Sequence, residues 1–97
     1  MIFKNDWNFG GEIVRLKDFG DGKGGNMTIR GITDVGGLIE VSVFMTEKIF
    51  KRIVDRDNYK YQKINANGHF EIKVHETSGN NIKQTLRLVA DDFQWIS

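Results

Sequence analysis

One aromatic side chain in this sequence is placed where it could stack on flat ligand groups. In LIEVSVFM (residues 38–45), side chains alternate between the two faces of a strand. The inward set is Ile39, Val41, Val43 and Met45, which leaves Phe44 on the opposite face. An outward phenyl ring is a platform on which unpaired bases stack. The alternative is that Phe44 covers the core beneath a following helix.

Basic residues recur on the same side of the strand patterns. Alternation predicts outward cations at five strand positions, and loops add two more. The strand cations are Arg15, Lys17, Arg30, Lys73 and Arg87, and the loop cations are Lys23 and Lys83. Each alone has an ordinary alternative as a solvated surface charge. As a set beside a stacking ring, they match what a phosphate chain with unpaired bases requires.

Glu40 shares the face of Phe44 and is unfavourable there unless it pairs with a cation such as Arg30. Four further rings, at Trp7, Phe19, Tyr59 and Tyr61, fall in loop-like stretches, and Lys60 and Lys63 accompany the tyrosines. These rings are predicted either to stack on bases or to plug an end of the fold. Trp95 is predicted to lie in the core or a subunit interface.

Three motifs with chemical potential are not supported as sites. GDGKGG (residues 20–25) precedes a strand, whereas a pyrophosphate site needs a helix N-terminus, so it indicates a hairpin loop. His69, Glu71 and His75 share a strand face, but no further His or Cys completes a metal site. Asp91 and Asp92 indicate turn or strand-edge polarity. We therefore expect no enzyme, no metal and no cofactor.

The elements that must position these residues are five strands and one helix. Period-two alternation marks 11–17, 26–32, 38–45, 69–76 and the closing run from residue 85, with glycine clusters between them read as strand ends. TEKIFKRIVD (residues 46–55) instead has helical spacing, with Thr46 as N-cap. The order predicts an all-β OB-fold, a five-stranded Greek-key barrel with one short helix between strands three and four.

The last strand lies at the end of the sequence, and we expect it to pair back to the first strand and close the barrel. The 97 residues suffice for one domain, residues 1–97. The net charge of +1 neither requires nor excludes a nucleic acid, and the absence of cysteine excludes disulfides. No stretch has the composition of a membrane span or a signal peptide, so a cytoplasmic protein is expected.

Four stretches together resemble the bacterial and phage single-stranded DNA-binding protein (SSB) family. NFGGEI is similar to the opening strand of that family, and NMTIRG to its Asn-Phe-Thr-Leu motif. VSVFMTEKIF resembles the end of its third strand, where an aromatic residue precedes the helix and stacks on a base. LRLVADDFQWIS is similar to its Val-Ala-Asp-Glu-x-Gln-Phe-Leu ending. The match of Phe44 to that aromatic residue comes from this resemblance.

The resemblance implies sequence-nonspecific binding of single-stranded DNA by a homodimer or homotetramer in replication, recombination or repair. Family members commonly carry an acidic recruitment tail, and none follows Ser97. This departure suggests a minimal phage- or plasmid-type protein or a truncated chain. The alternative is an OB-fold accessory module of a replication complex with weak or no DNA binding, favoured by Glu40, the missing tail and the near-neutral charge. A third reading is an RNA- or oligosaccharide-binding OB domain.

Overall fold

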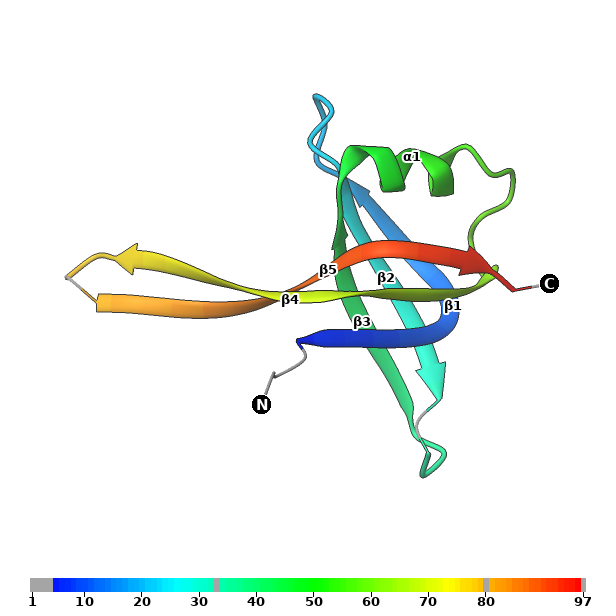
Figure 1. Ribbon diagram of the computed structural model, residues 1–97, viewed down its shortest axis with the longest axis horizontal. Helices are drawn as coiled ribbons and strands as arrows, with labels where there is room; N and C mark the ends of the chain where they lie inside the picture. The colour runs from blue at the N-terminus through cyan, green and yellow to red at the C-terminus, as the bar shows by residue number, and fades with distance from the viewer. Residues whose placement is uncertain (1–4, 33, 80, 97) are drawn as a thin grey trace.

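The computed structural model describes residues 5–32, 34–79 and 81–96. Its elements follow the predicted order of three strands, a helix and two strands (Figure 1). They are β1 (Asp6–Asp18), β2 (Gly25–Ile32), β3 (Leu38–Met45), α1 (Glu47–Val54), β4 (Lys63–Thr77) and β5 (Asn81–Trp95). The predicted bounds of β3 are confirmed, whereas β1, β4 and β5 are longer than the alternating stretches indicated.

The five strands form a closed barrel in the order β1-β2-β3-β5-β4, which confirms the all-β OB-fold. The expectation that the last strand pairs with the first is wrong. β5 pairs with β4 in an antiparallel ladder and meets β3 in a parallel contact between Phe44 and Val89. β1 bends at a bulge between Ile13 and Arg15, so its first half pairs with β4 and its second half with β2.

The core fills the barrel and one of its ends. Buried side chains from all five strands meet there, and Phe50 and Ile53 of α1 cover them. Thr46 occupies the predicted N-cap position, but its hydroxyl makes no capping hydrogen bond. The carbonyl oxygen of Thr46 accepts the hydrogen bond from the Phe50 amide, while Glu47 accepts one from the Gly24 amide. Among the described residues, no helix is long and apolar enough to cross a membrane.

Two sequence-based expectations about β1 are wrong. Gly10 and Gly11 lie inside the strand and do not end it. A Cβ on Gly11 would overlap the carbonyl oxygen of Arg30, so a glycine here permits two backbones to approach closely. Trp7 also belongs to β1, where it packs against the core and its indole nitrogen donates a hydrogen bond to the His69 carbonyl oxygen at 3.0 Å.

The outer part of the β4–β5 hairpin extends away from the barrel as a two-stranded ribbon (Figure 1). We call residues 71–77 and 81–87 the arm. The predicted alternation holds, but the apolar side does not face the core, since Ile72 and Val74 are 68% and 61% exposed. Lys83 is part of β5 and not of a loop. The arm therefore has two solvent-facing sides of different character.

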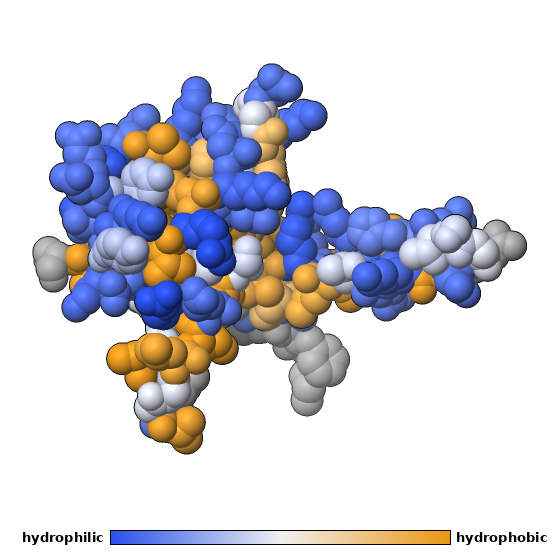
Figure 2. All heavy atoms as spheres, turned by 180° about the vertical axis from the view of Figure 1, so that it is seen from behind, coloured by the Kyte–Doolittle hydropathy of each residue, from blue (hydrophilic) through white to orange (hydrophobic). Residues whose placement is uncertain are grey.

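The β2–β3 hairpin carries a second exposed apolar region at its tip (Figure 2). Val35 is 94% exposed, and Ile32 and Leu38 are 75% and 72% exposed. Ile39, predicted to face inward, is also exposed, whereas Val43 and Met45 are buried as expected. The barrel core therefore ends before the tip of this hairpin.

Candidate nucleic-acid interface

The outer face of β1, β2 and β3 carries four of the residues predicted to contact a nucleic acid strand. Directly paired residues of antiparallel strands point to the same side of a sheet. One cross-strand row consists of Lys17, Asn26 and Phe44, and the next of Arg15, Thr28 and Ser42. The third row is Glu12, Arg30 and Glu40. The register thus places the predicted ring and three predicted cations on one outer surface.

The arm contributes a second polar surface. Its cross-strand pairs on one side are Glu71 with Arg87, Lys73 with Thr85, and His75 with Lys83. The opposite side holds Ile72 with Leu86, Val74 with Gln84, and Glu76 with Ile82. Three predicted cations therefore share one side of the arm, and the aliphatic residues share the other.

An open hollow of about 270 Å³ joins these two polar surfaces. The residues that line it come from β2, β3, β4 and β5, and they include amide, hydroxyl, imidazole and cationic groups beside the Phe44 ring. They are Asn26, Ser42, Phe44, Lys73, His75, Thr85, Leu86, Arg87 and Leu88. We refer to this hollow as the Phe44 groove.

Phe44 lines this groove and is not part of the core that α1 covers. Its ring is half-buried and is no member of the core cluster among the described residues. The Arg87 guanidinium carbon lies 4.2 Å from the ring centroid, and the Phe19 ring is 6.1 Å away at an interplanar angle of 16°. Lys17 Nζ is 6.0 Å from the Phe19 centroid. An aromatic pair flanked by two cations is suited to stacked bases and phosphates.

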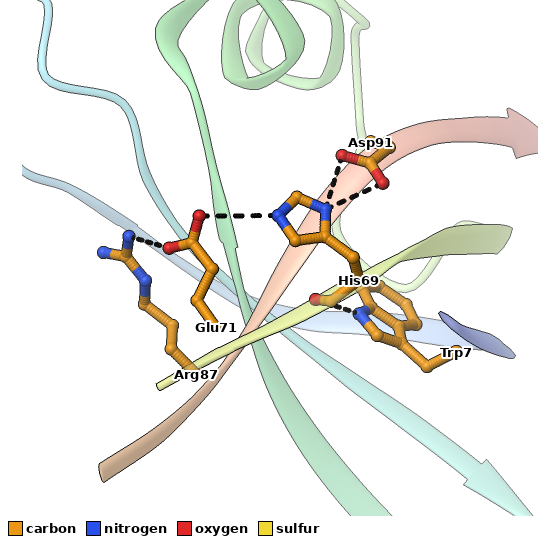
Figure 3. A network of polar contacts seen from close by, with 5 residues as sticks. All are labelled: Trp7, His69, Glu71, Arg87 and Asp91. Atoms are coloured by element: carbon orange, nitrogen blue, oxygen red, sulfur yellow. Dashed lines mark hydrogen bonds and ion pairs between the residues drawn. The ribbon is translucent and has the colours of Figure 1, made fainter. Parts of the chain in front are cut away.

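A chain of polar contacts fixes Arg87 at the edge of the groove (Figure 3). Arg87 Nη2 donates to Glu71 Oε1 at 2.6 Å, and Glu71 Oε2 lies 3.4 Å from His69 Nε2. His69 Nδ1 is 2.9 Å from both carboxylate oxygens of Asp91. The hydrogen bond to Asp91, followed by that to Glu71, raises the pKa of His69 above its ordinary 6.5. The bond from Arg87 is the main cause that lowers the pKa of Glu71.

The sequence-predicted residues fall into two groups in space. The Phe44 groove and the sheet face beside it gather Arg15, Lys17, Phe44, Lys73, Lys83 and Arg87. Arg30 lies two rows from Phe44 and pairs with Glu40 at 3.6 Å, as the sequence required for that carboxylate. Lys23 is exposed in the loop between β1 and β2.

Tyr59, Tyr61 and Lys63 follow α1 in the chain and lie outside the Phe44 groove, near the start of β4. Ile64, the neighbour of Lys63, pairs with Trp95 on β5. Phe44 pairs with Val89, six residues earlier on the same strand. At about 3.3 Å per residue, this separation is roughly 20 Å. The Tyr59 ring packs against the core, as the barrel-end alternative predicted, while Tyr61 is 60% exposed.

Sequence reasoning missed the polar partners of the groove. Asn26, Ser42, His75 and Thr85 line it, although only the cations and Phe44 were predicted. His69 and Glu71 were considered only as metal ligands, whereas they connect Arg87 to Asp91. The period-two pattern does place Ser42 on the outward side of β3 with Phe44, but Ser42 was not predicted as a contact.

Comparison with known proteins finds a likeness in structure and none in sequence. No protein-family model matches the chain, and no curated protein matches it. The mitochondrial single-stranded DNA-binding protein Rim1 of S. cerevisiae is similar at a TM-score of 0.68 and 12% identity, over 98% of this chain and 97% of that chain.

Two further solved structures share the fold. The N-terminal domain of PriB from Thermoanaerobacter tencongensis, described as dimeric, has a TM-score of 0.64 at 9% identity, over 96% of this chain and 97% of that chain. The Plasmodium falciparum SSB in complex with single-stranded DNA has a TM-score of 0.61 at 11% identity, over 100% and 98%. The chain therefore has an SSB-like OB-fold.

Proposed function

We propose that this protein binds single-stranded DNA without sequence preference, with the strand lying in the Phe44 groove. The observation that carries the proposal is an outward pair of stacked rings, with Arg87 over Phe44 and Lys17 over Phe19, on a barrel shared with single-stranded DNA-binding proteins. Bases stack on Phe44 and Phe19, and the cations contact the phosphates. In a duplex the bases are already paired and stacked on one another, so no base is exposed to stack on Phe44.

The predicted contacts form a path with a centre and two flanks. At the centre are Phe44, Arg87, Lys73 and Lys83, with Lys17 and Arg15 on the adjoining sheet face. Arg30 and Lys23 flank it. Longer strands continue to Tyr61 and Lys63, about 20 Å away along β5. Tyr59 is left out because its ring packs against the core.

The direct test is a fluorescence-anisotropy titration of labelled oligo-dT and of a duplex of equal length. We expect micromolar or tighter binding of oligo-dT and much weaker binding of the duplex. Each phosphate contact contributes about 0.7 to the slope of log K against log salt, so the affinity falls steeply as salt rises. Equal affinity for the two nucleic acids, or no salt dependence, would contradict the proposal.

The proposed context is replication, recombination or repair in the cytoplasm, where the protein protects exposed strands and performs no catalysis. We propose that it acts as a homodimer or homotetramer assembled through the aliphatic side of the arm. Ile72, Val74, Ile82 and Leu86 are each at least 60% exposed there, and a two-stranded ribbon without packing partners is marginally stable in water. Light scattering after gel filtration tests this assembly: Ile82→Lys should yield monomers, and an unchanged mass would contradict it.

A second candidate is an accessory module of a replication complex that binds DNA weakly or not at all. The exposed tip of the β2–β3 hairpin, with Ile32, Val35 and Leu38, favours this function because it is an apolar surface outside the groove. The ion pair between Arg30 and Glu40 also neutralises one cation of the proposed path. Absence of oligo-dT binding in the titration above would support this candidate.

A further inference from the structure

The ring assigned to base stacking is already covered by a side chain of the same chain. Arg87 stands over Phe44 with its guanidinium carbon 4.2 Å from the ring centroid, at van der Waals distance. A base that stacks on this side of Phe44 must either displace the guanidinium or stack on its outer face. The position of Arg87 therefore governs access to the groove.

Glu71 holds Arg87 in that position. The two residues are directly opposite each other on β4 and β5, and the 2.6 Å contact between Glu71 Oε1 and Arg87 Nη2 is a charge-assisted hydrogen bond. The second carboxylate oxygen of Glu71 contacts His69, which Asp91 fixes in turn (Figure 3). Glu71 is thus held from two sides, with its carboxylate against the Arg87 guanidinium at the edge of the groove.

The hydrogen bonding of Arg87 is incomplete in this arrangement. Its Nε is buried and has no acceptor among the residues that the structure describes. Buried donors without partners are uncommon in folded proteins, and they are satisfied where a ligand or a rearrangement supplies an acceptor. A phosphate group presents several oxygens and can accept from Nη2 and Nε of one guanidinium together.

The following inference rests on the proposed function. We propose that, in the free protein, the Glu71 carboxylate occupies the position at Arg87 that a phosphate of the DNA strand takes in the complex. Its carboxylate keeps Arg87 over Phe44, and DNA binds by exchanging that carboxylate for a phosphate at Arg87 while a base stacks on the ring-guanidinium pair. Glu71 is a positioning and specificity-determining residue. An anion alone must compete with Glu71, whereas a phosphate joined to an unpaired base gains the stacking contact as well.

The test compares Glu71→Gln with Asp34→Asn by oligo-dT titration. Asp34→Asn also removes one carboxylate charge, but Asp34 is an exposed residue of the β2–β3 turn, outside both the groove and the arm. We expect Glu71→Gln to bind oligo-dT about 2- to 5-fold more tightly, the size of a partly exposed ion pair, and Asp34→Asn to match the wild type. An abasic strand of equal length should gain more than oligo-dT does, so that the preference for a strand with bases falls.

Repeating the Glu71→Gln comparison in an Arg87→Gln protein distinguishes this exchange from simple charge repulsion between Glu71 and the DNA. If Glu71 acts through Arg87, the gain from Glu71→Gln disappears in Arg87→Gln protein. The proposal would be overturned, with DNA binding left intact, if the gain persists in the Arg87→Gln protein or if the Glu71→Gln and Asp34→Asn proteins bind with equal affinity. Failure of both the wild type and Glu71→Gln to bind oligo-dT would instead overturn the proposed function.

A measurement on the unmodified protein covers the case in which Glu71→Gln is poorly folded. The NMR resonance of the Arg87 Nε–H group reports its hydrogen-bond acceptor. Saturating oligo-dT should shift this resonance, because a phosphate oxygen supplies the acceptor that Nε lacks in the free protein. An unchanged resonance in the presence of bound oligo-dT would overturn the exchange.

Discussion

Two regions of this barrel place an arginine over a phenylalanine, yet they differ in what the ring does. Arg87 lies 4.2 Å from the Phe44 centroid, and Arg52 lies 4.3 Å from the Phe93 centroid. Each arginine is also paired with a carboxylate, Glu71 in the first case and Asp92 in the second. Stacking geometry alone does not distinguish the two regions.

The difference is the side of the strand on which each ring stands. Phe93 is 2% exposed and belongs to the core cluster, where it also contacts Trp95 edge-on. Phe44 is on the outward side of β3 and lines an open groove. Arg52 therefore covers the core, whereas Arg87 covers a surface that a ligand can reach. The comparison teaches that an aromatic-cation pair becomes a candidate binding site only where its ring is outside the core.

The largest expected effect is on the free energy of unfolding, which should distinguish Phe93 from Phe44. Phe93→Ala should lower the free energy of unfolding by about 3–5 kcal/mol, because it leaves a cavity in a closed core. Phe44→Ala should cost roughly 1 kcal/mol or less, as for a surface change. Urea unfolding followed by circular dichroism measures both. Equal destabilisation by the two substitutions would place Phe44 in the core and remove the distinction.

The arginines should differ in their effect on DNA affinity. Arg87→Gln is expected to reduce the slope of log K against log salt by about 0.7, the contribution of one phosphate contact. Arg56→Gln is the matched control, because Arg56 lies 4.3 Å from the Trp95 centroid at the far end of β5. Its slope for a short oligo-dT of about 8 nucleotides should equal that of the wild type. A smaller slope for both variants would mean that the strand also reaches the Trp95 end of β5.

Arg52 should contribute to stability and not to binding. It bonds Asp92 at 2.9 Å and stands over Phe93, with both charged side chains about half exposed. Arg52→Gln is expected to lower the free energy of unfolding by about 0.5–1 kcal/mol. The affinity for short oligo-dT should not change. Weakened binding without loss of stability would contradict the structural role.

The smallest expected effect concerns the pH dependence of His69. Because Asp91 raises its folded-state pKa above 6.5, protonated His69 stabilises the fold below that pH, and this contribution is lost as pH rises through the raised pKa. Asp91→Asn should therefore lower the melting temperature slightly at about pH 6 and have less effect at about pH 8. An NMR titration of His69 that gives an ordinary pKa in the wild type would contradict this.

Several features followed from the sequence because they depend on local patterns. The alternation in residues 38–45 predicted that Phe44 faces away from Val43 and Met45, and the structure confirms this. The helical spacing of Ile49, Phe50, Ile53 and Val54 likewise predicted an apolar face of α1. Phe50 and Ile53 are buried as expected, whereas Val54 is 46% exposed. Periodicity identifies residues that share a face, and it is reliable wherever that face meets the core.

Other features could not follow from local patterns. Alternation grouped Ile72 with Val74 but did not reveal that nothing in the described chain packs over them. The pairing of β5 with β3 depends on barrel closure, which periodicity does not encode. The contact between His69 and Asp91 joins residues 22 positions apart through the β4–β5 register. These features are set by tertiary packing.

The central claim is that a strand stacks on the outward ring of Phe44. Titration of oligo-dT into wild-type, Phe44→Ala and Val35→Ala proteins tests it most directly, since Val35 is an exposed apolar residue at the far tip of the β2–β3 hairpin. We predict that Phe44→Ala weakens binding about 5- to 150-fold, corresponding to roughly 1–3 kcal/mol of lost stacking, and that Val35→Ala matches the wild type. Identical affinities for all three proteins would contradict the claim.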